Sequence, residues 1–153
     1  MPSDVNQALR DTIDLRRYAL RMQEIKLSVS LMQDPPLVLA DPFQLQQVFI
    51  NLLSNAEQAV SHQPGDRNIS VKTEVRGECF VVTISDSGPG IAPEALPHIF
   101  NPFFTTKPRG AGTGLGLSIS DGIIREHRGV LRTKSEPGHG ATFEVELPLT
   151  PAT

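Results

Sequence analysis

Residues 68–86 read NISVKTEVRGECFVVTISD, and this stretch decides the class of fold. Apolar and polar residues alternate over 69–75, the period-two pattern of a strand with one buried and one solvated face. The dipeptide Arg76-Gly77 supplies a turn, and residues 79–85 return as the second strand. The stretch therefore predicts an antiparallel hairpin inside a larger sheet.

The segments around this hairpin carry helical and further strand patterns. Apolar residues recur at helical spacing in 4–24, and Asp41 followed by Pro42 marks a helix start. We expect helices at 4–24, 42–62 and 115–126, a short one at 93–99, and further strands at 26–31, 37–40, 130–135 and 142–147. Helices against one face of a mixed, mostly antiparallel sheet predict an α+β two-layer sandwich, formed by a single domain over 1–153.

Composition excludes several classes of protein. The 153 residues carry a net charge of −3, whereas nucleic-acid binders normally show a basic excess, so no nucleic-acid partner is expected. The single cysteine, Cys79, excludes an intrachain disulfide framework and is interpreted as an ordinary sheet residue. No apolar run approaches the ~20 residues that span a bilayer, and the start does not resemble a signal peptide. We therefore expect a cytoplasmic domain without membrane contact.

Two asparagines at the edge of an apolar helical stripe are the first candidate site residues. Asn51 and Asn55 lie one turn apart in the helix expected at 42–62, although asparagine is a poor helix former. Their amide oxygens are hard ligands that suit a magnesium ion. The alternative is a pair of polar residues that merely flank a buried helix.

An acidic residue at the end of a strand is the second candidate. Alternation places Asp86 on the same inward face as the apolar residues before it, where an ionised carboxylate is costly without hydrogen-bond donors. Gly88 and Gly90 remove side chains, so a flat ligand can approach the backbone. Asp86 can then accept a hydrogen bond from an exocyclic amine such as that of adenine, or it can simply close a tight turn.

A glycine-rich run before a helix is the third candidate. Residues 110–118 read GAGTGLGLS, and alternating glycines before a helix expose backbone N–H groups that can hold an anion. The preceding run 101–107 reads NPFFTTK, in which Phe103 and Phe104 could latch a lid and Lys107 could contact phosphate. The alternatives are a flexible loop and a small satellite core with an exposed lysine.

The order of these features resembles the catalytic ATP-binding domain of two-component sensor histidine kinases. Residues 44–56, 86–90, 100–107 and 112–117 match its N box, first glycine box, F box and second glycine box in sequence. The sequence FFTTK at 103–107 most resembles the corresponding motif of kinases of the nitrogen-regulation type. The resemblance implies the Bergerat fold of the gyrase, chaperone, kinase and mismatch-repair superfamily, with a mobile lid over ATP.

The resemblance also implies roles for individual residues. Asp86 matches the residue that binds the adenine amine, and Thr142 matches the hydroxyl that assists it. Asn55 matches the Mg²⁺ ligand, whereas Asn51 stands where related ATPases carry a water-activating glutamate, so phosphoryl transfer to a protein histidine is favoured over hydrolysis. The catalytic residues implied are Asn51, Asn55 and Lys107. The nucleotide-binding residues implied are Asn51, Asn55, Gln58, Asp86, Gly88, Gly90, Ile91, Phe100, Thr106, Lys107, Gly112, Thr113, Gly114, Leu115, Gly116, Leu117 and Thr142.

The phosphoacceptor expected of such a kinase is missing from this chain. None of the histidines, at 62, 98, 127 and 139, stands in a phosphoacceptor-like context. His127 is interpreted as structural, and His62 and His139 as solvated turn residues. We therefore expect a domain that binds Mg²⁺ and ATP, remains monomeric, does not phosphorylate itself, and acts on a separate dimerising helical hairpin upstream of a response regulator. Gln58 departs from the family, many members of which carry a cation at this position.

Two other functions fit the same residues. One is a domain of the same fold with another acceptor, such as an anti-sigma-factor serine kinase or a hydrolysing ATPase. The other is a degenerate nucleotide-sensing module without enzymatic activity. Binding of Mg²⁺ and ATP separates the last of these from the kinases.

Overall fold

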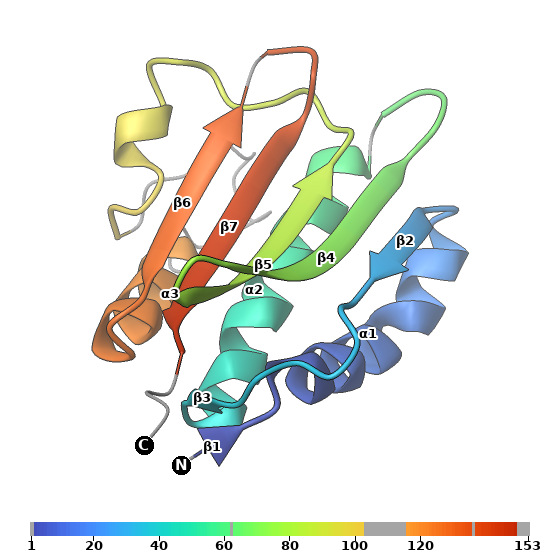
Figure 1. Cartoon of the computed structure of the whole chain (residues 1–153). Helices are drawn as coiled ribbons and strands as arrows, with labels where there is room; N and C mark the ends of the chain where they lie inside the picture. Colours follow the sequence, from blue (N-terminus) through green and yellow to red (C-terminus); the bar gives the residue numbers. More distant parts are fainter. Residues whose placement is uncertain (1, 62, 103–115, 136, 150–153) are drawn as a thin grey trace.

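The computed structural model describes residues 2–61, 63–102, 116–135 and 137–149. Its main sheet has the strand order β2-β4-β5-β7-β6, and α1, α2 and α3 cover one face of it, called the inner face below (Figure 1). The elements are β1 (Pro2–Ser3), α1 (Val5–Met22), β2 (Lys26–Ser30), β3 (Val38–Leu39), α2 (Pro42–Val60), β4 (Asn68–Arg76), β5 (Cys79–Asp86), the 3₁₀ helix η1 (Leu96–His98), α3 (Gly116–Glu126), β6 (Val130–Ser135) and β7 (Ala141–Pro148). The α+β two-layer prediction is confirmed.

The sheet is mixed, as expected. β4 and β5 form the predicted hairpin, with Ile69 opposite Asp86, and β5 pairs antiparallel with β7. β2 alone among the described strands of this sheet runs parallel to its neighbour, β4. The N-terminal β1 was not predicted; it pairs antiparallel with β3 in a separate two-stranded sheet. Two residues are too few to show any periodicity.

Helix α2 lies at the centre of the helical layer. The carboxylate of Asp41 accepts hydrogen bonds from the backbone N–H groups of Phe43 (2.9 Å) and Gln44 (3.4 Å), and Pro42 occupies the first turn. This cap satisfies donors that the first turn leaves without helical partners. The apolar side chains of α2 that face the core are Leu45, Val48, Phe49, Leu52, Leu53, Ala56 and Val60.

One acidic side chain, Glu57, is buried on α2. Its side chain is 4% exposed and binds Arg16 of α1 through two hydrogen bonds, Nη2–Oε1 at 2.6 Å and Nε–Oε2 at 3.0 Å. Gln23 adds a third donor at 3.3 Å. A buried carboxylate needs such partners, so this contact fixes how α1 lies against α2.

His127 joins the end of α3 to the start of α2. Its Nε2 accepts the backbone N–H of Asp41 (3.1 Å), so Nδ1 carries the proton and donates to the carbonyl of Ile123 (2.8 Å). The predicted structural role of His127 agrees with this geometry, and His139 is exposed, as expected.

We expect His127→Ala to lower the free energy of unfolding by about 1–2 kcal/mol, because it leaves the N–H of Asp41 and the carbonyl of Ile123 without this partner. Urea denaturation measures the effect. His139→Ala is the matched control and should leave the midpoint unchanged. Equal midpoints for both variants would refute the bridging role.

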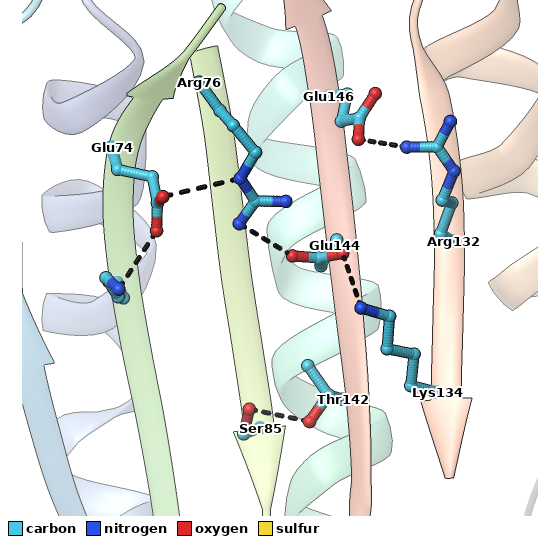
Figure 2. Close-up of polar contacts among 9 residues, drawn as sticks. Glu74, Arg76, Ser85, Arg132, Lys134, Thr142, Glu144 and Glu146 are labelled. Atoms are coloured by element: carbon cyan, nitrogen blue, oxygen red, sulfur yellow. Dashed lines mark hydrogen bonds and ion pairs between the residues drawn. The ribbon is translucent and has the colours of Figure 1, made fainter. Parts of the chain in front are cut away.

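The outer face of the sheet carries charged side chains in rows across the strands (Figure 2). Arg76 of β4 lies between Glu74 (3.4 Å) and Glu144 of β7 (3.0 Å), and Lys134 of β6 reaches Glu144 at 3.9 Å. Further ion pairs join Lys72 to Glu74 and Arg132 to Glu146. Each of these cations therefore has a carboxylate partner on this face.

Candidate functional site

Asp86 lies at the end of β5 on the inner face and is 8% exposed. Its Oδ1 accepts the backbone N–H of Gly88 (2.8 Å), and the backbone amide of Ala141 also faces the carboxylate. Burial raises the pKa of Asp86, while these two amides act in the opposite direction. Asp86 thus closes a turn, and its carboxylate keeps acceptor capacity for a further donor, since a carboxylate offers about four acceptor sites.

The loop that follows Asp86 lies on the last turn of α2. A Cβ built on Gly88 would stand 2.9 Å from the carbonyl oxygen of Ala59 and 3.0 Å from its Cβ, so only glycine allows this approach. Gly90 has a φ of +81°, which favours glycine. Gly88 therefore lets the backbone of the loop pack on α2, whereas the access of a flat ligand expected at Gly88 and Gly90 stays a prediction.

Asn51 sits at the other end of the same helix face. Its Nδ2 donates to the carbonyl of Gly116 and to the hydroxyl of Ser120, both at 3.2 Å, while its Oδ1 accepts from Gln47 (3.3 Å). The amide therefore holds the first turn of α3 against α2. Here Asn51 acts as a brace between helices, which is closer to the structural alternative than to a ligand.

Asn51, Asn55 and Ala59 mark three successive turns of α2. At 1.5 Å per residue, they span about 12 Å. The buried acid Asp86 lies by one end of this row and the N-terminus of α3, at Gly116, by the other. The row thus suits an elongated ligand with a flat donor group at one end and anionic groups at the other, where helix N–H groups attract anions.

Asn55 is half-buried in the middle of this row. Its side-chain oxygen belongs to the ligand type that magnesium prefers, and the described residues hold no cluster of three acidic, histidine or cysteine side chains. One amide suits an ion that takes most of its ligands from water and phosphate, so the donor set fits Mg²⁺ bound with a nucleotide.

The expectation that the Thr142 hydroxyl assists Asp86 is wrong for this structure. Thr142 pairs with Ser85, and the two hydroxyl oxygens lie 2.9 Å apart on the outer face (Figure 2). Asp86 pairs with Ala141 and faces inward. The alternation of β7, in which Phe143 points into the core, places Thr142 on the opposite face from Asp86.

The remaining predicted site residues fall into three groups. Ile91, Phe100 and Leu117 are half-buried and pack against the core. Gln58 is exposed on α2. The residues that lie outside the described part of the chain are Phe103, Phe104, Thr106, Lys107, Gly112, Thr113, Gly114 and Leu115.

Two serines near the site were missed by sequence reasoning. Ser120 is fully buried against Asn51, and Ser135 bonds to the backbone at Ile91 and Gly140. Ser135 lies opposite Ala141, which in turn lies opposite Asp86, so the three residues share one cross-strand row. Pairing the expected strands 130–135 and 142–147 across their connecting turn was the route by which Ser135 could have been found. Within the described residues, no helix combines the length and apolarity needed to cross a bilayer.

Comparison with known proteins agrees with this geometry. Residues 40–151 match the family described as "Histidine kinase-, DNA gyrase B-, and HSP90-like ATPase". The chain is 38% identical, over 95% of its length, to sporulation kinase E of Bacillus subtilis (strain 168) and to sensor histidine kinase ZraS of Escherichia coli (strain K12). It spans only 19% and 30% of the lengths of these two relatives.

Solved structures give the same result at the level of the fold. The nucleotide-free catalytic domain of histidine kinase ThkA superposes with a TM-score of 0.85 at 34% identity, covering 99% of this chain and 98% of that one. Full-length ShkA in complex with AMPPNP superposes with a TM-score of 0.86 at 27% identity, covering 100% of this chain and 32% of that one. The chain therefore belongs to the histidine kinase-, DNA gyrase B- and HSP90-like ATPase family, in the form found as the catalytic domain of sensor histidine kinases.

Proposed function

We propose that this domain binds ATP with Mg²⁺ along α2 and donates the γ-phosphoryl group to a histidine on a separate helical hairpin. The observation that carries the proposal is that a buried acid, Asp86, and the N-terminus of α3 lie at opposite ends of one face of α2. The AMPPNP complex of the related ShkA supports a nucleotide as the ligand.

The adenine is assigned to the Asp86 end of the site. The buried carboxylate accepts a hydrogen bond from the exocyclic amine. The triphosphate extends past Asn55 to the N–H groups at the start of α3. Gln58, Lys107 and the glycines at 112–116 stay predictions as phosphate contacts.

Mg²⁺ fits beside Asn55, where it would neutralise charge on the phosphate oxygens. The amide oxygen of Asn55 orients that end of the ligand. Asn51 braces α3 through Gly116 and Ser120, and so keeps the helix N-terminus directed at the phosphates.

The reaction class follows from a residue type. Asn51 stands where related ATPases carry a glutamate, and an amide cannot take a proton from water. Transfer to an imidazole nitrogen needs no water-activating base: a P–N bond forms, the bond from the γ-phosphorus to the bridging oxygen breaks, and ADP leaves.

The partners proposed are a dimerising hairpin with the phosphoacceptor histidine, in the same or another polypeptide, and a response regulator downstream. ThkA, whose catalytic domain this chain resembles, has been solved in complex with the response regulator protein TrrA. The nitrogen-regulation subtype rests on the FFTTK wording at 103–107 and is proposed on that ground alone. The cytoplasm is the compartment proposed, and a monomer the state of the isolated domain.

Calorimetric titration with AMPPNP, with and without Mg²⁺, tests the binding step. We expect measurable affinity that Mg²⁺ strengthens; no binding in either case would leave only a non-enzymatic module. Labelled ATP then tests the acceptor. Label should reach a hairpin supplied as a second polypeptide and should not appear on the chain alone, and release of phosphate without a hairpin would indicate an ATPase instead.

A further inference from the structure

Ser135, the last residue of β6, connects two parts of the chain that surround Asp86. Its Oγ accepts the backbone N–H of Ile91 at 2.6 Å and donates to the carbonyl of Gly140 at 3.0 Å. A serine hydroxyl has one donor and two acceptor positions, so both bonds form at once. Ile91 is the residue at the far end of the loop that starts at Asp86.

The carbonyl of Gly140 belongs to the same peptide unit as the N–H of Ala141, which faces the carboxylate of Asp86. A continuous chain of hydrogen bonds therefore runs from the Ile91 N–H through the Ser135 hydroxyl and the 140–141 peptide to Asp86. Each bond in such a chain polarises the next.

Two other sets of hydrogen bonds hold the loop of 86–91. One lies near the start of the loop, and the other is made by backbone atoms alone. Ser87 exchanges hydrogen bonds with Asn68 at the start of β4, at 3.0 Å and 2.9 Å. The carbonyl of Pro89 accepts the N–H of Gly138 at 2.7 Å. Ser135 thus supplies the side-chain anchor at the end of the loop.

We propose that Ser135 is a positioning residue for nucleotide binding, which holds the loop of 86–91 and the 140–141 peptide in the conformation that receives the adenine. The proposal rests on the proposed function, because it assigns Asp86 to the adenine. Without the hydroxyl the loop spends part of its time in other conformations, and the apparent affinity falls in proportion to the competent fraction.

Thr133 offers a matched control on the same strand and face. Its hydroxyl donates to the carbonyl of Thr142 at 3.2 Å, as that of Ser135 does to Gly140, but it does not contact the loop. Both side chains are half-buried. Removal of either hydroxyl therefore costs one bond to the backbone of residues 140–142, and only Ser135→Ala also releases Ile91.

ADP binding by calorimetry and amide exchange at Ile91 by NMR test the proposal. We expect Ser135→Ala to raise the Kd for ADP roughly five- to twentyfold and to accelerate exchange of the Ile91 amide. Thr133→Ala should leave both near wild type, and Ser135→Thr, which keeps the hydroxyl, should restore both. If Ser135→Ala does not fold, Ser135→Cys, with its weak hydrogen-bonding thiol, takes its place.

An unchanged Kd in a folded Ser135→Ala variant would overturn the positioning role, as would an equal loss of affinity in Thr133→Ala. Wild-type protein that binds no ADP would instead overturn the proposed function. In that case the exchange rate at Ile91 still decides whether Ser135 holds the loop.

Discussion

Asp86→Asn is expected to weaken binding of adenine nucleotides about 30- to 100-fold, or roughly 2–3 kcal/mol, because a charge-assisted hydrogen bond to the exocyclic amine becomes a neutral one. The buried position of Asp86 makes this loss large, since little water competes for the carboxylate. Calorimetry with ADP measures it. Asp34→Asn removes the same charge at an exposed position and should bind like wild type.

The same variant is expected to keep or gain stability at pH 7. Burial raises the pKa of Asp86, so the folded state holds the proton more tightly than the unfolded chain does. The ionised acid therefore costs stability at neutral pH, and this cost disappears as the pH falls through the raised pKa to the ordinary value. Asparagine avoids the cost, while its Oδ1 can still accept the Gly88 N–H.

Urea denaturation at pH 7 and pH 4 checks the sign. The difference in the free energy of unfolding between Asp86→Asn and wild type should be smaller at pH 4 than at pH 7. Nucleotide affinity of the wild type should fall over the same pH range, whereas that of the variant should stay level. If Asp86→Asn lowered the free energy of unfolding by more than about 2 kcal/mol at pH 7, the role of Asp86 would be mainly structural.

Gly140→Ala is expected to cost at least about 3 kcal/mol of the free energy of unfolding, a large part of the 5–15 kcal/mol typical of a domain. Gly140 has a φ of +80°, and a Cβ there would overlap the carbonyl oxygen of Asp86. Backbone on both sides must move, since no flexible side chain can yield. Because β5 and β7 meet here, the strain falls directly on Asp86.

Gly138 separates the two causes of this loss. It has a φ of +84°, but a Cβ there meets nothing within 4 Å. Gly138→Ala should therefore cost only the backbone strain, about 1–2 kcal/mol. Urea denaturation of both variants measures the difference, and similar values for the two would show that the contact with Asp86 relaxes freely.

Local patterns sufficed for most of the fold. The alternation on both sides of Gly77 predicted β4 and β5, and the Asp41-Pro42 cap predicted the start of α2 within a residue. These signals depend on neighbours in sequence. Glu57 shows their limit: its burial inside an apolar stripe depends on Arg16, 41 residues away, which no periodicity reveals.

The site divides in the same way. Strand alternation correctly predicted that Asp86 points inward. The role of Thr142 was assigned from the resemblance alone, although the alternation of β7, with Phe143 buried, places Thr142 on the outer face. Asn51 was expected to present its amide to a ligand, yet it bonds to Gly116 and Ser120, a contact between α2 and α3 that only the tertiary structure supplies.

The parallel pairing of β2 with β4 has a consequence for the order of assembly. β4 and β5 are adjacent in sequence and can pair as a hairpin early in folding. β2 can pair with β4 only after the segment that contains α2 has packed against the sheet, because Lys26 pairs with Asn68, 42 residues later. β2 is also an edge strand whose side chains are mostly exposed, and segments with few buried contacts are the first to open. We therefore expect β2 to separate from β4 before the other strands of this sheet come apart, when the domain is exposed to a protease or pulled mechanically.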